Sequence, residues 1–413
     1  MQSARWVPIV VCLSCLISLP HSHAGGGQVE NPPTLQASSL LPPPNTSGPN
    51  YSIDDTVVND GFENRFVLKT NYGTFVVEGH ESLKERVREL QVISRIEQLS
   101  QSDEFAKQFG NKLLAPVTTA TNLLTKPGET VQGVFTGVGN FFDKVSAAAT
   151  TQDPHQEKGL SALLGFDSAK RQIAFQLGAD PYSRFQPLQD RLDQLAQTAV
   201  SARLTAGAIL AVIPGAAGTA VGGLGTAGDI QSIIKDNTPA QLSKRNEQLL
   251  AKMAVPANLV TRFLMNPSFT PTEKTAIVEA LRRLGNVQNR AEYIRRAADI
   301  NDAGAAYFFY RRAPLTVAYH ERVERAARFV TLGGVPVIQT ASGKVVALFP
   351  IDHLAWTATA DTIFRRMQAD LKGAAVKVEL WLGGTASELA RERLGKHGWV
   401  VREKVGESLG GRS

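Results

Sequence analysis

The spacing of apolar residues in the middle of the chain is helical. Leucine and alanine recur at alternating steps of four and three residues between Leu188 and Ala202, which predicts an amphipathic helix. A second helix is predicted where Thr270 and Glu273 form a capping box around a proline, and Gly285 should end it. A third should run from about residue 290 to 310. Helices therefore account for most of the predicted structure.

Near the N-terminus the pattern changes to that of β-strands. Residues 66–70 and 74–77 are rich in β-branched and aromatic side chains on either side of a turn sequence, which predicts a β-hairpin. Two strands alone would not be stable, so we expect them to pack on the helix that a capping box at Ser82–Glu85 should begin. Further helices are predicted over residues 102–124 and 130–147.

The last hundred residues mix strands with helices. Strands are predicted at residues 328–332, 335–340, 345–349 and 376–382, with a final strand from Trp399. Pro336 lacks an N–H group, so its strand should lie at the edge of the sheet. Helices are predicted over residues 359–371 and after Gly384, and the order strand, helix, strand at the C-terminus fits a βαβ crossover.

These elements predict a mainly α protein with a small N-terminal β-hairpin packed on helices and a C-terminal α/β domain. The chain as a whole is therefore expected to be α+β. The expected organisation is a signal peptide at residues 1–24, a disordered Gly/Pro/Ser-rich tether at 25–50, a hairpin with helices at 51–150, a helical region at 159–312 and an α/β domain at 313–413.

Residues 204–228 form the most unusual segment. These 25 residues carry no charge and include seven glycines and seven alanines, with Pro214 near the middle. We expect a Gly/Ala-rich helical hairpin that turns at Pro214 and packs through its small residues. Two alternatives stay open. The hairpin is either buried in the core or inserted in a membrane, since its length is enough to span a bilayer.

The first 24 residues have the three parts of a secretory signal: Arg5, an apolar run over residues 6–19 and a small-residue site ending at Ala24. The run is too short to span a bilayer, which favours cleavage over anchoring. Cys12 and Cys15 both lie in this segment, so cleavage leaves no disulfide, thiolate nucleophile or cysteine zinc ligand. Lipidation at Cys15 is the alternative, although Cys12 stands where a lipoprotein signal has leucine.

Charge is divided unevenly along the mature chain. Residues 25–235 contain 17 basic and 21 acidic residues, a net of −4, whereas residues 236–413 contain 26 and 17, a net of +9. A cationic C-terminal half can attract an anionic partner such as lipid headgroups, glycans or nucleic acid, although no specific nucleic-acid motif is present and local pairing of the charges is the stronger interpretation. Part of the excess has a local reason, because Arg282 and Arg283 should offset the dipole at the end of a helix.

Two groups of residues in the C-terminal domain are candidates for chemistry. The first follows a predicted strand and precedes a helix, where backbone N–H groups and hydroxyls can hold an anion. It comprises Gly383, Gly384, Thr385 and Ser387. Thr385 could instead serve only as a helix N-cap. The second is Asp352 and His353, which follow another strand and could act as an acid/base pair, although adjacent side chains rarely point at one substrate atom.

Motifs for metals, cofactors and nucleophiles lack their context. His320 and Glu324 would share a helix face, but no third ligand is identified and the neighbouring arginines favour a solvated surface, so no metal is predicted. The glycines at 223–228 have dinucleotide-binding spacing without a preceding strand, so no cofactor is predicted. Residues 406–410 match the sequence of a nucleophile elbow, but no histidine follows them to act as the base, so no nucleophile is predicted there. No catalytic residue is therefore assigned.

The sequence therefore favours an exported bacterial protein of the periplasm or cell envelope, of a non-enzymatic binding or structural type. Its partner would be another protein or an anionic envelope component, and contact with a membrane is a further expectation. Two other hypotheses stay open. One is a membrane-inserting protein that acts through residues 204–228, and the other is an enzyme with its site on the C-terminal α/β domain.

Overall fold

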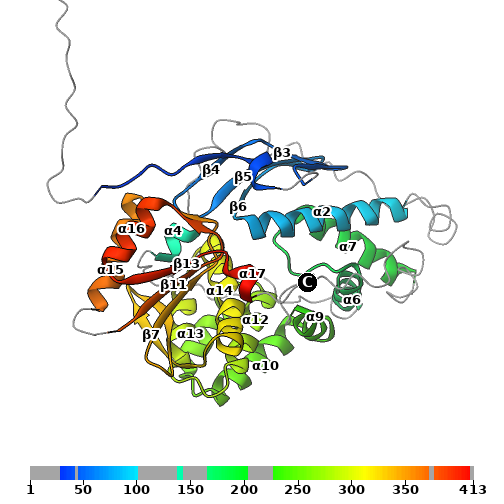
Figure 1. Cartoon of the computed structure of the whole chain (residues 1–413). Helices are drawn as coiled ribbons and strands as arrows, with labels where there is room; N and C mark the ends of the chain where they lie inside the picture. Colours follow the sequence, from blue (N-terminus) through cyan, green and yellow to red (C-terminus); the bar gives the residue numbers. More distant parts are fainter. Residues whose placement is uncertain are drawn as a thin grey trace, which may run out of the picture.

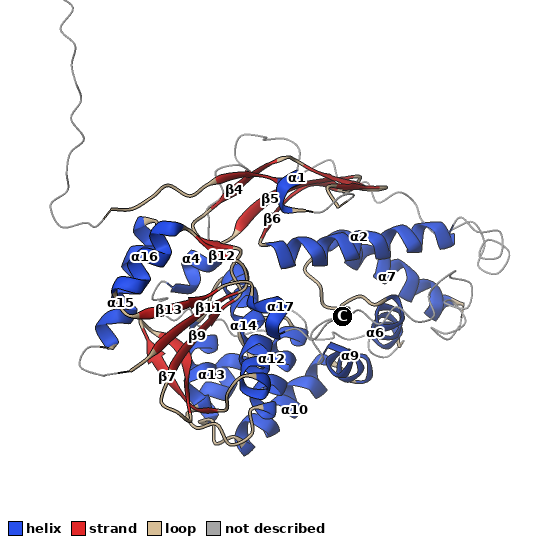
Figure 2. Cartoon of the chain, viewed as in Figure 1, coloured by secondary structure: helices blue, strands red, loops and turns tan. Residues whose placement is uncertain are grey.

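The computed structural model describes residues 28–41, 45–100, 137–142, 165–202, 227–371 and 376–409. Helices are combined with an antiparallel sheet near the N-terminus and a mixed sheet in the C-terminal domain (Figure 1). Figure 2 shows the N-terminal sheet along one side of the molecule, next to the long helix α2 (His80–Ser100), and the C-terminal sheet with helices packed around it. The predicted combination of helical and α/β parts is confirmed at this level.

The N-terminal sheet is larger than a hairpin. Its six strands are β1 (Thr34–Gln36), β2 (Ser47–Gly48), β3 (Tyr51–Ile53), β4 (Thr56–Asn59), β5 (Asn64–Thr70) and β6 (Gly73–Glu78). β5 and β6 are the predicted hairpin, and β3 and β4 pair with β5 along its other edge. β1 and helix α1 (Ala37–Leu40) lie in the expected tether, where Ala37 and Leu41 are buried. The prediction of a disordered tether is wrong for this stretch. The hairpin supplies a surface against which a few apolar residues are enough to hold the segment in a folded position.

Helix α2 begins at His80, two residues before the predicted start at Ser82. The carboxylate of Asp352, in the C-terminal domain, accepts the His80 N–H at 3.0 Å. The first turn of α2 is thus satisfied by a residue far away in sequence. The predicted apolar side is confirmed, since Leu83 and Leu90 are buried.

The helical body contains α4 (Gly137–Phe142), α6 (Phe166–Leu177), α7 (Gln186–Ser201), α9 (Ala227–Asp236), α10 (Pro239–Lys252), α11 (Ala257–Leu264) and α12 (Pro271–Arg283). The predicted apolar seam of α7 is confirmed by the complete burial of Leu188, Leu192 and Leu195. The predicted capping box of α12 is also present: Thr270 Oγ1 accepts the Glu273 N–H, and the Glu273 carboxylate accepts the Thr270 N–H.

The helix predicted over residues 290–310 is in fact two helices, α13 (Arg290–Asp299) and α14 (Ala303–Arg322). The break occurs where the Asp302 side chain accepts the Ala305 N–H and so caps a new helix. α14 then continues past Pro314, across the predicted domain boundary between residues 312 and 313. One helix therefore belongs to both predicted domains.

The C-terminal sheet follows the prediction closely. Its strands are β7 (Ala326–Leu332), β8 (Val335–Thr340), β9 (Val345–Phe349), β11 (Val378–Leu382) and β13 (Trp399–Arg402), in the order β13-β11-β9-β8-β7. β9, β11 and β13 are parallel, with α15 (Ala358–Asp370) and α16 (Glu388–Lys396) between them, so the βαβ unit is confirmed. Three short elements complete the domain: β10 (His353–Leu354), β12 (Thr385–Ala386) and α17 (Val405–Leu409).

The prediction that Pro336 marks an edge strand is wrong, because β8 lies between β7 and β9. β8 pairs with β9 only at Ile338 and Gln339, so the proline nitrogen lies beyond that ladder and no hydrogen bond is lost. Arg312 lies between the two strands here, and its guanidinium donates to the carbonyl oxygens of Pro336 and Leu348.

The two larger hydrophobic cores of the described residues divide the molecule differently from the predicted domains. One lies between the N-terminal sheet and helices α2, α6 and α7. The other combines α4 and α10 to α15 with the C-terminal sheet. Helix α4 therefore packs with the C-terminal part of the chain, although it precedes α6 and α7 in sequence.

Several predicted segments lie outside the described residues. These are the helix at 102–124, all of the helix at 130–147 except α4, and nearly all of the apolar segment 204–228. Among the helices that the structure describes, none has the length and apolar character needed to cross a membrane.

Candidate functional site

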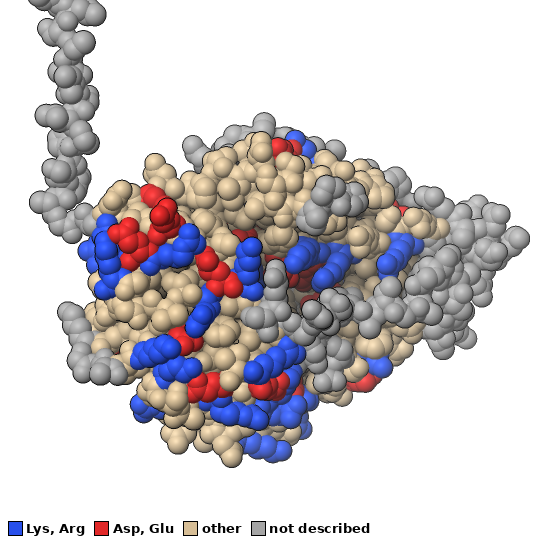
Figure 3. Space-filling view, viewed as in Figure 1, with Lys and Arg blue, Asp and Glu red and all other residues tan. Residues whose placement is uncertain are grey.

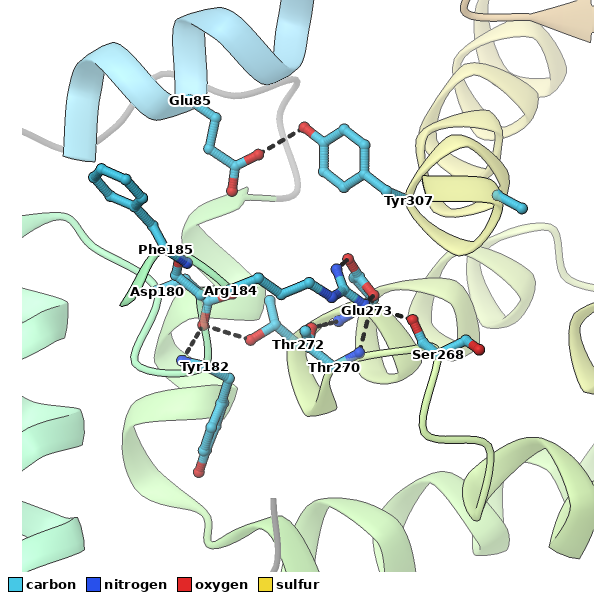
Figure 4. Close-up of polar contacts among 12 residues, drawn as sticks. Glu85, Asp180, Tyr182, Arg184, Phe185, Ser268, Thr270, Thr272, Glu273 and Tyr307 are labelled. Carbon is cyan, nitrogen blue, oxygen red and sulfur yellow. Dashed lines mark hydrogen bonds and ion pairs between the residues drawn. The ribbon is translucent and has the colours of Figure 1, made fainter. Parts of the chain in front are cut away.

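Five charged residues from distant parts of the chain meet between α2 and the helical body, and we call them the carboxylate–arginine cluster. They are Glu85, Glu89, Asp180, Arg184 and Glu273. Two lie on α2, two in the loop between α6 and α7, and one in the first turn of α12. Figure 4 shows Arg184 extending toward Glu273, with Glu85 across from them. Charged groups this close together are candidates for a functional site.

Asp180 fixes the loop that follows α6. Its Oδ1 accepts the Tyr182 N–H at 2.9 Å, which closes a turn, and the Thr272 hydroxyl at 2.7 Å (Figure 4). Because Thr272 lies in the first turn of α12, one carboxylate connects the loop to the start of that helix. Burial raises the pKa of Asp180 to about 6.

Arg184 and Glu273 form a two-point ion pair. The guanidinium binds both oxygens of Glu273 and also donates to the carbonyl oxygen of Ser268. Glu273 Oε2 accepts the Thr270 N–H at 2.9 Å as well, so the helix cap and the ion pair share one carboxylate. Burial raises the pKa of Glu273, which is 5% exposed. Pairs with this geometry are strong and directional.

Helix α2 contributes two carboxylates on the same side. Glu89 accepts the Ser183 hydroxyl and an N–H of Arg86. Burial raises the pKa of Glu89 to about 8. Glu85 accepts the Tyr307 hydroxyl at 2.6 Å, which connects α2 to α14 (Figure 4).

The cluster holds four elements together: α2, the loop between α6 and α7, α12 and α14. Each of its charged groups has a protein partner, so the arrangement is that of a structural network of ion pairs and hydrogen bonds. Among the described residues there is no group of three or more His, Cys, Asp and Glu side chains that could hold a metal ion.

Glu89 should make the protein less stable as the pH rises. Its pKa is about 8 in the fold and about 4.3 in an unfolded chain, so the native state binds one more proton between these values. Its contribution to stability is complete below about pH 4.3 and is lost as the pH rises through 8. Glu89→Gln does not titrate and should reduce this loss by roughly 1–3 kcal/mol between about pH 5 and 8, measured by urea unfolding.

Glu81→Gln is the matched control for that experiment. Glu81 lies on the same helix, its side chain is 56% exposed and it pairs with Lys84. Despite some burial, Lys84 lowers the pKa of Glu81, so this carboxylate is ionised in both states above about pH 5. The control should leave the pH dependence unchanged. An equal change in both variants would contradict the role assigned to Glu89.

Asp352, one of the two acid/base candidates, joins the two ends of the molecule. Its carboxylate accepts the N–H groups of Asn64 and His80. In the opposite direction, the N–H groups of Asp352 and His353 donate to the carbonyl oxygen of Phe62. Burial raises the pKa of Asp352. This residue therefore fixes the N-terminal sheet and α2 to the end of β9.

The same junction contains a buried ion pair. Arg311 Nη1 donates to Glu63 Oε1 at 2.9 Å, and the two side chains are 9% and 7% exposed. Arg311 also donates to the carbonyl oxygen of Pro350. Burial raises the pKa of Glu63 to about 8. Helix α14, the N-terminal sheet and the end of β9 are thus tied together at one point.

His353, the second acid/base candidate, points to the other candidate group instead of joining Asp352. Its Nδ1 lies 2.8 Å from Thr385 Oγ1, because these residues are paired between β10 and β12. Ser387 caps α16, and its hydroxyl donates to Glu30. Burial lowers the pKa of His353. The structure therefore brings His353, Thr385 and Ser387 together at the carboxyl ends of β9 and β11, where α/β folds bind ligands.

The backbone N–H groups of this turn are already in use. Four of them donate to the carbonyl oxygens of residues 349, 351, 352 and 354, and these are the N–H groups of Gly383, Gly384, Thr385 and Ser387, in that order. That of Ala386 donates to Glu403. The anion site expected here therefore lacks its N–H donors. The N-cap is Ser387 and not Thr385, because β12 delays the start of α16.

His320 and Glu324 do not come together as metal ligands. His320 Nδ1 accepts the Ala326 N–H at 3.0 Å, and its Nε2 lies 2.9 Å from Arg325 Nη1. Glu324 pairs with Lys344, which lowers the pKa of that carboxyl to about 2.

Comparisons with known proteins give no match: no family model fits the chain, and no curated protein and no solved structure is significantly similar to it. The functional argument therefore rests on the sequence and on the geometry of the described residues.

The sequence pattern does not predict the carboxylate–arginine cluster. It assigns Glu85 and Glu273 to capping boxes, and nothing in it places residues 180–184 between them. One local signal exists, since Asp180 precedes a proline in a turn sequence where an aspartate can accept the N–H two residues further on. That signal predicts the turn but not its neighbours.

Proposed function

We propose that this chain is an exported cell-envelope protein that binds a partner and does not itself catalyse a reaction. The observation that supports this most directly is how its buried acids are used. Five of those with raised pKa values connect separate segments of the chain: Glu63, Glu89, Asp180, Glu273 and Asp352. A sixth, Asp60, closes a local turn by accepting the N–H groups of Phe62 and Glu63. A catalytic acid or base must reach the substrate, whereas these groups are occupied by protein partners. They tie separate segments of the body together, which suits a protein that presents a surface to a partner.

The charge distribution favours an anionic partner. Residues 236–413 carry a net charge of +9. Figure 3 shows Lys and Arg side chains, with Asp and Glu among them, over the C-terminal domain and the helices next to it. Such a surface attracts anionic components of an envelope, among them lipid headgroups and charged glycans. We infer that the partner is one of these.

Cell fractionation tests export and binding together. The mature protein should begin at Gly25, stay with the envelope in about 0.01 M salt and be released in about 1 M salt, where charges are screened within about 3 Å. Cys15→Ser should change none of these results. A precursor that stays in the cytoplasm, or envelope binding that is insensitive to salt, would overturn the proposal.

The contact between His353 and Thr385 favours a second candidate function, an enzyme on the C-terminal domain. A hydroxyl 2.8 Å from an imidazole nitrogen has the geometry of a nucleophile and its base. Burial lowers the pKa of His353 and outweighs the opposing charges of Glu30 and Glu403, so the neutral imidazole that a general base needs is favoured.

Turnover of ester, amide and glycoside substrates by the purified exported protein decides between these candidates. If the second is right, Thr385→Val should lower turnover by about a hundredfold or more. Thr362→Val is the control, because this exposed hydroxyl on α15 donates, within the described part of the chain, only to the carbonyl oxygen of Ala358 in its own helix. If the Thr385→Val variant loses turnover and the Thr362→Val variant keeps it, the protein is an enzyme and the binding proposal is wrong.

A further inference from the structure

A cavity of about 330 Å³ lies where α12 ends and β7 begins. Its polar walls are Arg283 and Asn286, from the end of α12 and the loop after it, and His320 and Arg325, from the last turn of α14 and the residues before β7. None of these side chains belongs to the carboxylate–arginine cluster or to the junction around Asp352. The cavity is therefore separate from both sites.

The hydrogen bonds around His320 leave two donors facing each other. The Ala326 N–H donates to Nδ1 at 3.0 Å, so Nδ1 carries a lone pair and the proton of the neutral ring is on Nε2. Burial and the charge of Arg325 lower the pKa of His320, which favours the neutral ring. Arg325 Nη1 lies 2.9 Å from Nε2, and a guanidinium has only donors. Two N–H groups thus face each other, and no residue within the described ranges places an acceptor between them.

Arg283 brings further donors to the same cavity. Its Nε and Nη2 bind the carboxylate of Glu321 at 2.8 to 3.2 Å. Its Nη1 has no partner within the part of the chain that the structure describes, and Arg325 has no carboxylate partner there either. Because Glu321 neutralises only Arg283, the cavity keeps the positive charge of Arg325.

The wall of the cavity is held in place by the backbone. The pairing of β7 with β8 skips Ala327, which is a β-bulge facing the cavity. The Ala327 carbonyl oxygen accepts the Gln288 N–H at 2.9 Å, and the Gln288 carbonyl oxygen accepts the Phe329 N–H at 3.0 Å. The loop after α12 is thereby fixed against β7. Bulges are frequent next to functional sites.

We propose that this cavity binds an oxyanion of the phosphate type through Arg325, His320 Nε2–H and Arg283 Nη1. One oxygen to the side of this contact, within reach of both Nε2 and the Arg325 guanidinium, turns an unfavourable approach of two donors into two hydrogen bonds to a charged acceptor. Arginine also matches phosphate geometry with paired N–H groups. The same chemistry fits a soluble phosphate ester or a lipid phosphate headgroup. This inference rests on the proposed function, in which the partner is anionic, and it identifies a phosphate group as the part of the partner that the protein binds.

Inorganic phosphate is the probe, and calorimetric titration of the purified exported protein is the measurement. The wild type should bind phosphate at one site, and Arg325→Gln should weaken binding about tenfold or more. His320→Asn should do the same, because its amide oxygen can still accept the Ala326 N–H while the Nε2 donor is gone. Arg322→Gln is the control, since it removes the same charge from an exposed neighbour that does not line the cavity.

The control separates a built site from general attraction. Equal weakening by Arg325→Gln and Arg322→Gln, or no binding at millimolar phosphate, would overturn the site. Thermal unfolding of each variant checks that its fold is kept, and His320→Asn provides a second test if Arg325→Gln does not fold. Failure of phosphate binding, with export and salt release intact, would remove this site and leave the proposed function standing.

Vesicles containing phosphatidylglycerol distinguish the two sources of the phosphate group. If the wild type and Arg322→Gln float with these vesicles and Arg325→Gln does not, the site binds a lipid headgroup. If all three behave alike with vesicles while only Arg325→Gln loses inorganic phosphate, the ligand is a soluble phosphate ester. Either result supports the site.

Discussion

Arg311→Met should lower the free energy of unfolding by about 3–5 kcal/mol. The substitution keeps an aliphatic side chain but removes the guanidinium that binds Glu63 and the carbonyl oxygen of Pro350. Both members of the ion pair are less than a tenth exposed, at 9% and 7%, so water cannot replace the lost partner. The remaining carboxylate must stay buried without its partner or take up a proton. Guanidinium chloride unfolding above about pH 8, where the Glu63 carboxyl is ionised, measures the cost.

Arg295→Met is the matched control. The pair that Arg295 forms with Glu292 is 51% and 36% exposed, and exposed pairs contribute only about 0–1 kcal/mol. A double-mutant cycle with Glu63→Gln shows whether the effect passes through the ion pair, since Arg311→Met should then cost less by about 1 kcal/mol or more. Equal costs for Arg311→Met and Arg295→Met would mean that the junction does not hold the molecule together.

Local signals were enough to predict the elements whose caps and apolar stripes are close in sequence. Helix α12 is the clearest example, because Thr270, Glu273 and Gly285 define both its ends within one stretch of chain. The strands of the C-terminal sheet follow for the same reason, since each alternates or clusters apolar residues between turns. The break at Asp302 was missed because an aspartate inside a helical pattern is compatible with either one helix or two.

The N-terminal sheet depends on contacts between residues far apart in the chain, which a local sequence pattern cannot predict. Ala37 and Leu41 are too sparse to predict a folded segment, and they are buried only because a hairpin some thirty residues later provides the surface. Helix α2 begins at His80 because Asp352 accepts its N–H across 272 residues of chain. Such contacts depend on how the two ends of the molecule meet, which no sequence window records.

The candidate sites also have a part that the sequence predicts and a part that only the fold reveals. His353 and Thr385 were found separately from strand ends, and the parallel pairing of β10 with β12 places them in contact. The N–H groups expected to hold an anion beside them are used by the neighbouring strand, which sequence spacing could not reveal. The sequence offers His320 as a metal ligand, whereas its role in the oxyanion proposal depends on which of its nitrogens accepts the Ala326 N–H. That is a property of the folded chain alone.

The position where the C-terminal domain tolerates least change should be Gly384. A Cβ added there would lie 2.9 Å from Asp352 Cα and closer still to the carbonyl group of that residue. All of these are backbone atoms, so no side-chain rotation can relieve the clash. Gly384→Ala should therefore lower the free energy of unfolding by about 3 kcal/mol or more.

The reason for so large an effect is that the clash displaces Asp352. Its carbonyl oxygen accepts the Thr385 N–H, and its carboxylate accepts the N–H at the start of α2, so a shift at Gly384 disturbs two domains. The exchange of the His80 amide hydrogen should become faster in Gly384→Ala. Gly395→Ala is the control: it lies within α16 with nothing within 4 Å of its added Cβ, and should stabilise the protein by about 0.5–1 kcal/mol. If Gly384→Ala were as stable as Gly395→Ala, the close approach of residues 352 and 384 would have to be absent in solution.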